Sequence, residues 1–229
     1  MIPLRDDQPC YSTPFINYFL IVINVLIFLW ERFVDFHNPA ALQAVVTDFG
    51  IVPRHAVAVL TGHSYDSPAS AILPLFTSMF LHGGFAHVAG NMLFLWIFGD
   101  NVEDYLGHLR YLLFYLGGGI VGSVTHILLN THSTAPTIGA SGAIAGVLGA
   151  YFILYPRARV LVWFIIFLFY VPAWLMLGYW FLVQFLSGTS AAIMQTGIAV
   201  WAHIGGFVTG VVLIKVLGER PHRYRYGSW

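Results

Sequence analysis

Two short glycine-rich segments of this sequence carry the residue types that a serine-based nucleophilic site needs. Ser141 lies in the segment Gly-Ala-Ser-Gly at residues 139–142, and His203 is followed by Gly206 and Gly210. A serine hydroxyl becomes a nucleophile when a neighbouring imidazole removes its proton, and the imidazole later returns a proton to the leaving group. Ser141 and His203 are therefore the candidate catalytic pair.

Both residues also have a purely structural explanation. Small residues such as serine and glycine let membrane helices approach closely, and a single histidine in a helix bundle is commonly a hydrogen-bonded packing residue. Gly206 and Gly210 share the helix face of His203, three and seven positions further on. We expect this face to pack against the glycine-alanine face that follows Ser141, which would bring the two polar side chains together and favours the catalytic interpretation.

A third polar cluster supplies candidate hydrogen-bond donors. His87 and Asn91 are four residues apart, so they project from one helix face, and both can donate to a developing negative charge. Backbone N–H groups near Gly139, at the start of a helix, are further candidate donors for this oxyanion. His82 precedes this face and is expected to have a structural role in its loop.

The ten carboxylates lie in tails, connections or the ends of apolar stretches, so the acid of a Ser-His-Asp triad is missing. A Ser-His dyad remains. Metal binding by His82, His87 and His203 is the chemical alternative, but the spacing of the first two is not the i, i+4 pair of a helical zinc site. We expect no metal and no cofactor.

The composition indicates that these residues belong to a membrane protein. Hydrophobic residues make up 58% of the 229 residues and charged residues 9%, against roughly 25% charged in typical globular chains. The balance of ten basic and ten acidic residues gives no sign of a nucleic-acid partner, whereas the lipid bilayer is an expected one. The apolar stretches predict an all-α, polytopic bundle of six transmembrane helices, at residues 15–30, 85–98, 109–129, 141–155, within 160–186 and 198–217.

Basic residues predict the orientation of this bundle, because cytoplasmic loops carry an excess of Lys and Arg. With both termini in the cytoplasm, only Arg32 and Arg54 fall on the outer side. The others fall on the inner side: Arg5, Arg110, Arg157, Arg159, Lys215, Arg220, Arg223 and Arg225. We therefore expect cytoplasmic segments at 1–14 and 218–229 around a membrane domain at 15–217. The short tails and the lack of a transit-peptide pattern lead us to expect a bacterial inner membrane.

These motifs, in this order, resemble the rhomboid intramembrane serine proteases over about residues 74–217. The resemblance implies that Ser141 is the nucleophile and His203 its base. It also implies that His87 and Asn91 line the oxyanion site.

The resemblance also implies a structural residue, a route of substrate entry and a class of substrates. Glu103, in the turn after the second span, would be structural, and the fifth span would form a lateral gate. The implied substrates are single-span membrane proteins, cut near the outer membrane boundary. An inactive relative that binds transmembrane helices without cutting them stays open as the alternative.

Three features depart from the family pattern. Many members carry a tyrosine four residues after the serine that stacks on the catalytic histidine, whereas this chain has Ala145, so another group must orient His203. Leu73 and Pro74 stand where some members have Trp-Arg. Residues 156–200 are longer than in small members, and Pro172 is expected to separate an interfacial segment from the fifth span.

Overall fold

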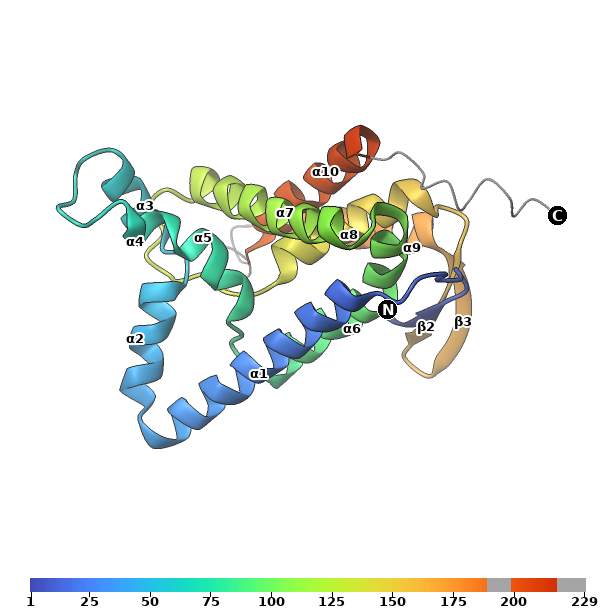
Figure 1. Ribbon diagram of the computed structural model, residues 1–229, viewed down its shortest axis with the longest axis horizontal. Coiled ribbons are helices and arrows are strands. Elements are labelled where there is room, and N and C mark those ends of the chain that lie inside the picture. Colours follow the sequence, from blue (N-terminus) through green and yellow to red (C-terminus); the bar gives the residue numbers. More distant parts are fainter. Residues whose placement is uncertain (189–198, 218–229) are drawn as a thin grey trace.

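The computed structural model describes residues 1–188 and 199–217, and most of them lie in helices that form one bundle (Figure 1). The predicted mainly helical membrane fold is confirmed. The predicted tail at 218–229 and the first residue of the predicted span at 198–217 lie outside the described residues. The main helices are α1 (Phe15–His37), α6 (Phe85–Leu106), α7 (His108–Leu129), α8 (Ser141–Leu154), α9 (Ala173–Gly188) and α10 (Val200–Leu217).

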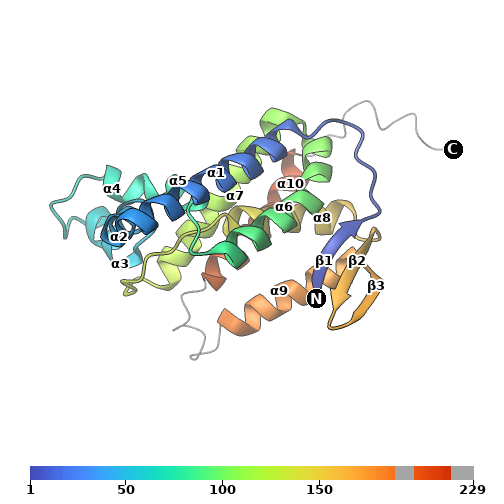
Figure 2. The ribbon, with the colours of Figure 1, turned by 90° about the horizontal axis from the view of Figure 1, so that it is seen from below.

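Helix α8 is the centre of the bundle and packs against α6, α7, α9 and α10 (Figure 2). Its residues from Gly142 to Tyr151 are all buried. Within the described residues, α7 and α10 are long and apolar enough to cross a membrane, whereas α8 and α9 are shorter apolar helices. The segment Ala69–Phe80 with α6 could make another span, bent by 79°. The number of six spans stays a prediction.

The connection between α1 and α6 is folded into short helices. It contains α2 (Pro39–Phe49), α3 (Pro53–Leu60), α4 (Ala69–Ile72), α5 (Pro74–Thr77) and the 3₁₀ helix η1 (Ser78–Phe80). Ile51 exchanges backbone hydrogen bonds with Thr137, so this connection is tied to the loop that precedes α8. The loop that leads into Ser141 is thereby held from outside the bundle.

A small antiparallel sheet adds to the helices a feature that hydropathy did not indicate. Its strands are β1 (Ile2–Asp6), β2 (Arg159–Phe164) and β3 (Phe167–Pro172), in the order β1-β2-β3. Strand β1 occupies part of the predicted cytoplasmic segment 1–14, and Ile2 pairs with Trp163. Helix α9 begins only after Pro172, so the proline does stand between a non-helical segment and the fifth apolar helix.

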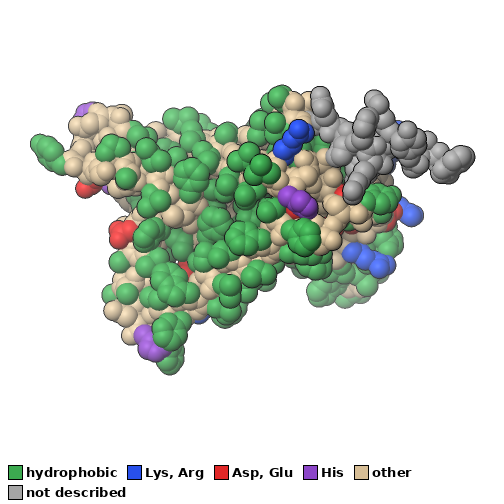
Figure 3. Space-filling model, viewed as in Figure 1, with side chains coloured by type: hydrophobic (Ala, Val, Ile, Leu, Met, Phe, Trp, Pro, Cys, Tyr) green, Lys and Arg blue, Asp and Glu red, His purple; other side chains and the backbone are tan. Residues whose placement is uncertain are grey.

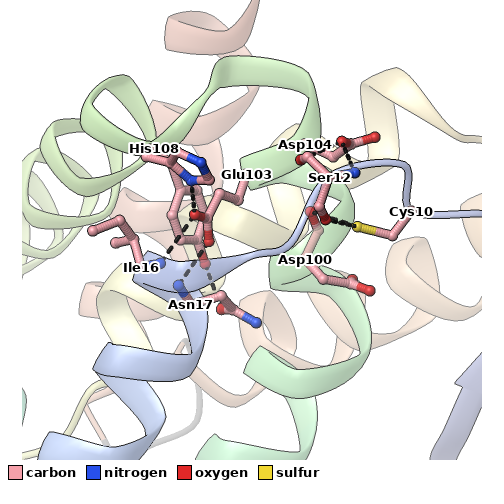
Figure 4. Close-up of polar contacts among 9 residues, drawn as sticks. Cys10, Ser12, Ile16, Asn17, Asp100, Glu103, Asp104 and His108 are labelled. Atoms are coloured by element: carbon pink, nitrogen blue, oxygen red, sulfur yellow. Dashed lines mark hydrogen bonds and ion pairs between the residues drawn. The ribbon is translucent and has the colours of Figure 1, made fainter.

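The end of α6 is bonded to the start of α1. The buried carboxylate of Glu103 accepts hydrogen bonds from the amides of Ile16 (3.0 Å) and Asn17 (2.7 Å) and contacts His108 (Figure 4). The first amides of a helix lack intrahelical acceptors, so this carboxylate satisfies two of them and interacts favourably with the helix dipole. Glu103 therefore joins α6 to α1 and α7.

Glycines bring α8 and α10 into backbone contact. A Cβ atom added at Gly206 would lie 2.0 Å from the carbonyl oxygen of Gly142, and one at Gly210 would lie 1.9 Å from that of Gly146. No side chain fits in these gaps, so only glycine permits the observed separation of the helices. The predicted packing of two small-residue faces is the geometry that the structure has.

We predict that Gly210→Ala lowers the thermal stability of the detergent-solubilised protein substantially, because α10 must move away from α8 or strain the backbone. Overpacking of this kind costs about 1–3 kcal/mol or more. Gly117→Ala is the matched control, since a Cβ there meets nothing within 4 Å, and alanine is the better helix former. Equal effects of the two substitutions on the midpoint of thermal unfolding would contradict this account.

We predict that the sheet contributes a pH-dependent term to stability. Burial raises the pKa of Asp6 from 3.8 to about 6, although the hydrogen bond from Tyr151 opposes the rise. Because the folded state holds this proton more tightly than the unfolded state, stability falls as the pH rises from about 4 to 6 and stays lower above that range. Asp6→Asn should therefore raise the unfolding midpoint at neutral pH and leave it unchanged near pH 4.

Asp7→Asn is the matched control of opposite sign. Burial raises the pKa of Asp7, but its hydrogen bonds and ion pair with Arg159 lower it by more, and the net pKa lies below 3.8. This variant should lose stability at neutral pH. An Asp6→Asn effect of the same size at both pH values would show that the proton is not involved.

Candidate active site

Ser141 and His203 are hydrogen-bonded in the interior of the bundle. Ser141 is the first residue of α8, and its Oγ lies 2.7 Å from Nε2 of His203, in the first turns of α10. The backbone contact between the two helices fixes this short distance. The pair has the geometry that proton transfer from a serine hydroxyl to an imidazole requires.

Gln184 of α9 holds the other nitrogen of the imidazole. Its Oε1 lies 2.8 Å from Nδ1 of His203. An amide oxygen can only accept, so Nδ1 carries the proton and Nε2 is left with the lone pair that the Ser141 hydroxyl needs. Gln184 thus contacts the imidazole at the nitrogen to which the carboxylate of a triad would bond.

Sequence reasoning missed Gln184, although a signal for it exists. It is the one amide side chain in α9, whose other residues are almost all apolar, and polar groups at membrane depth are expensive. Trp180 lies one turn before it, and its ring centroid is 5.9 Å from that of His203, at an interplanar angle of 37°. Both groups that position the imidazole therefore come from one face of α9.

Ala145 is where the family tyrosine would stand, and its surroundings explain why a small residue suits this chain. Ala145 is fully buried, and its Cβ would lie 3.4 Å from a Cβ added at Gly206. The α8–α10 contact thus occupies the space beside Ala145. The question that the sequence raised about the orientation of His203 is answered by α9 instead.

A cavity of about 460 Å³ opens next to the serine, between α6, α8, α9 and α10. His87 and Asn91 line it from α6, and Ser141 and His203 line it from α8 and α10. Phe94 on α6 and Trp180 on α9 line its sides, and the remaining lining residues are apolar or glycine. A mostly apolar cavity with a few convergent polar groups is typical of a ligand or substrate site.

His82 supports Asn91 from behind. His82 is fully buried, and its Nε2 lies 3.0 Å from Nδ2 of Asn91. The backbone N–H of His82 donates to the buried carboxylate of Glu31, whose oxygens are 3.1 and 3.3 Å away. Asn91 therefore uses one amide hydrogen on His82 and has a second for the cavity. Glu31, which directly follows the predicted span 15–30 and lies within α1, belongs to this support.

Gly139 shapes the loop before Ser141 but does not offer its own amide. Its φ is +128°, and a Cβ there would lie 2.7 Å from Nε2 of His87, so both conformation and space require glycine. The Gly139 N–H donates to the carbonyl of Ser78 at 2.8 Å. This amide is therefore already engaged, which argues against the expectation that it binds an oxyanion, and the first amides of α8 are left as the candidate backbone donors.

Among the residues that the structure describes, no three His, Cys, Asp or Glu side chains gather as metal ligands would. The proposed alternative ligand His203 is instead engaged with Ser141 and Gln184. His82 and His87 face each other edge to face, with ring centroids 5.1 Å apart. In these contacts His82, His87 and His203 have different partners and do not converge on a common point.

The fold and site define an integral membrane protein whose helical bundle encloses a mostly apolar cavity that contains a serine and a few other polar side chains. The chain belongs to the rhomboid family: the rhomboid domain matches residues 69–220. This family includes intramembrane serine proteases. The assignment agrees with the resemblance seen in the motifs around Ser141, His203 and His87.

Known relatives share parts of the chain. YdcA of Bacillus subtilis, provisionally named a rhomboid protease, is 36% identical over 119 residues, which are 48% of this chain and 57% of YdcA. Rhomboid protein 1, mitochondrial, of Saccharomyces cerevisiae is 36% identical over 146 residues, 59% of this chain and 39% of the relative. Rhomboid protease GluP of Bacillus subtilis is 47% identical over 76 residues, 33% of this chain and 14% of GluP. The chain thus spans less than two thirds of each relative's length.

We predict that Gln184 controls the reactivity of Ser141. Gln184→Leu removes the acceptor for Nδ1–H, so the imidazole can adopt the wrong tautomer, and the rate of labelling by a fluorophosphonate should fall by about 10²-fold. Gln184→Glu keeps an acceptor and should retain labelling. Gln43→Leu, in α2, is the control for a general effect of the substitution. Unchanged labelling in Gln184→Leu would remove Gln184 from the site.

Proposed function

We propose that this protein is an intramembrane serine endopeptidase that uses a Ser141–His203 dyad. The observation that carries the proposal is the 2.7 Å contact from Ser141 Oγ to His203 Nε2, with Nδ1 held by Gln184. This arrangement leaves the serine next to a neutral base of the correct tautomer. A packing serine would not need that arrangement.

The chemistry follows from the geometry. Ser141 Oγ attacks the scissile carbonyl carbon while His203 Nε2 takes the hydroxyl proton, giving a tetrahedral intermediate with a negative oxygen. His203 then gives the proton to the leaving amine, and the peptide bond breaks to leave an acyl-Ser141 ester. A water molecule, deprotonated by the same imidazole, hydrolyses the ester and restores the serine.

The cavity offers donors for the negative oxygen. His87 and Asn91 line the wall across from the serine, and the first amides of α8 lie at the serine itself. Donors held in place before the reaction stabilise the developing charge without reorganisation, and one such donor is worth roughly 2.7–4 kcal/mol. In this proposal, the oxyanion forms between the helix N-terminus and the two α6 side chains.

The proposed substrates are single-span membrane proteins. An α-helix hides its carbonyls in i→i−4 hydrogen bonds, so the substrate must unwind locally before Ser141 can attack. The cavity is bounded by α6 and α9, which makes the space between these helices the proposed lateral entry. The distribution of Lys and Arg supports an orientation with both termini in the cytoplasm, and the position of Ser141 at the start of α8 then places cleavage near the outer boundary of the proposed bacterial inner membrane.

The alternative function is binding of transmembrane helices without cleavage. It would use the same mostly apolar cavity but would have no need for the Ser141–His203 bond. The two functions separate experimentally, because a pure binder keeps its activity when the serine hydroxyl is removed. The dyad geometry is what favours the protease.

We predict that Ser141→Ala or His203→Ala abolishes cleavage of a single-span reporter substrate by the purified, reconstituted protein. The loss should be on the order of 10³-fold or more, and the double variant should be no worse than either single one, since the two residues act as a unit. Ser64→Ala and His63→Ala, in the loop between α3 and α4, are the matched controls. Cleavage that survives in Ser141→Ala would refute the proposal, and substrate binding without cleavage by the unmodified protein would favour the alternative.

A further inference from the structure

The β2–β3 hairpin carries a surface that the proposed catalytic site does not use. Its outer half, residues 163–170, consists of eight consecutive apolar or aromatic residues, and all of them are exposed. Successive residues of a strand point to opposite faces, so both faces of this half are apolar. A strand beside a protein core and water would instead alternate. This surface is suited to an apolar medium on both sides.

The turn of the hairpin supports this interpretation independently. Ile165 and Ile166 form a two-residue turn, and Ile165 has φ +58°. Such turns strongly prefer Asn-Gly or similar pairs, because positive φ is costly for a β-branched residue. The chain nevertheless places isoleucines there, which are 72% and 78% exposed. The turn therefore presents large apolar side chains at a cost in backbone energy.

The base of the hairpin is chemically different from its tip. The Arg5 guanidinium donates to the hydroxyl of Tyr170 at 3.0 Å, and the Arg159 guanidinium lies 5.7 Å from the centre of the same ring. Arg157, just before β2, is exposed. Going from base to tip, the arginines are followed by the hydroxyl of Tyr170, and the three residue pairs between it and the turn contain only aliphatic and aromatic side chains. This order matches the passage from lipid headgroups to acyl chains.

The hairpin is placed to meet the bilayer. It lies at the end of the bundle where α8 ends, opposite the end that holds Ser141, and runs across the direction of α7 and α8 (Figures 1 and 2). Strand β3 continues directly into α9, whose exposed Trp174 and Leu175 extend the apolar surface. In Figure 3 hydrophobic side chains are spread over the visible face of the molecule, and charged side chains are few. The hairpin therefore extends the exposed apolar surface of α9 beyond the end of the helix bundle.

We propose that the outer half of the β2–β3 hairpin is a lipid anchor, inserted into the leaflet on the side of the bundle opposite Ser141. Residues 163–170 contact acyl chains, and the arginines at the base lie at the level of the anionic headgroups. Because β3 runs into α9 without a linker, the anchor fixes the adjoining end of the helix that holds Gln184. The occupant of this surface is lipid, not protein.

The test measures the surroundings of the tip directly. In a Cys10→Ser background, Ile166→Cys or Leu168→Cys carries a nitroxide label in nanodiscs of phosphatidylcholine and phosphatidylglycerol, and Tyr65→Cys, in the fully exposed loop before α4, is the aqueous control. Collisions with oxygen report lipid, and collisions with a water-soluble nickel chelate report water. We expect oxygen to dominate at both hairpin positions and nickel at residue 65.

Two results would overturn the proposal. Nickel dominance at residues 166 and 168 would place the tip in water, and strong spin–spin coupling between labels on different molecules would show that a second copy covers the tip. The midpoint of thermal unfolding in detergent, compared with that of the Cys10→Ser parent, reports the folded state of each variant. The result on the hairpin therefore stands apart from the result on catalysis.

A second variant separates anchoring from folding. Ile165→Asn with Ile166→Gly installs a favourable turn and removes the apolar tip, so stability in detergent should be unchanged or higher. In nanodiscs, a label at Leu168→Cys should shift from oxygen toward nickel dominance. A label that stays in lipid despite this substitution would show that the isoleucines are not the anchor.

Discussion

The carbonyl oxygens of Gly142 and Gly146 occupy the positions where side chains at 206 and 210 would otherwise lie. This contact of backbone with backbone is the constraint on which the site depends. Ser141 begins one of the two helices and His203 lies near the start of the other, so the separation of the helix axes sets the distance between their side chains. Any side chain in the contact would widen it and part the dyad.

The surroundings of this contact are arranged to keep it from shifting. Glu103 bonds the start of α1 to the end of α6, and Glu31 reaches from α1 to the amide of His82. Both carboxylates are buried and serve backbone amides, so each compensates the cost of burial with specific hydrogen bonds. The result is a rigid wall of helices on one side of the cavity, while α9 closes the other side.

Much of this could be predicted from the sequence because it rests on glycine and on polar residues in apolar surroundings. Gly206 and Gly210 at helical spacing indicated a close helix contact, and Ser141 and His203 were unusual enough to indicate chemistry. The pairing of His87 with Asn91 followed from their i, i+4 spacing. These features depend on local sequence alone, which explains why they were accessible.

The remainder depends on contacts that sequence spacing does not reveal. Gln184 was overlooked because its partner, His203, is nineteen residues away on another helix. Helical periodicity relates residues of one helix and does not predict contacts between two helices. The hairpin was hidden in an uninterrupted apolar run, where helix and strand cannot be told apart by periodicity. The amide of Gly139 donates to Ser78, which belongs to a distant segment of the chain. The sequence does not reveal this bond, so the amide looked free to bind an oxyanion.

Helix α9 has two roles, since it lines the cavity and also supplies the amide that holds the imidazole. In terms of thermodynamic linkage, the position of this helix and the tautomer equilibrium of His203 are coupled. Displacing α9 outward breaks the bond at Nδ1 and leaves the ring free to exchange its proton between nitrogens. Under the proposed function, the competent base exists only while α9 is in this position, so admission of a substrate past α9 and activation of the nucleophile would be consecutive events within one catalytic cycle.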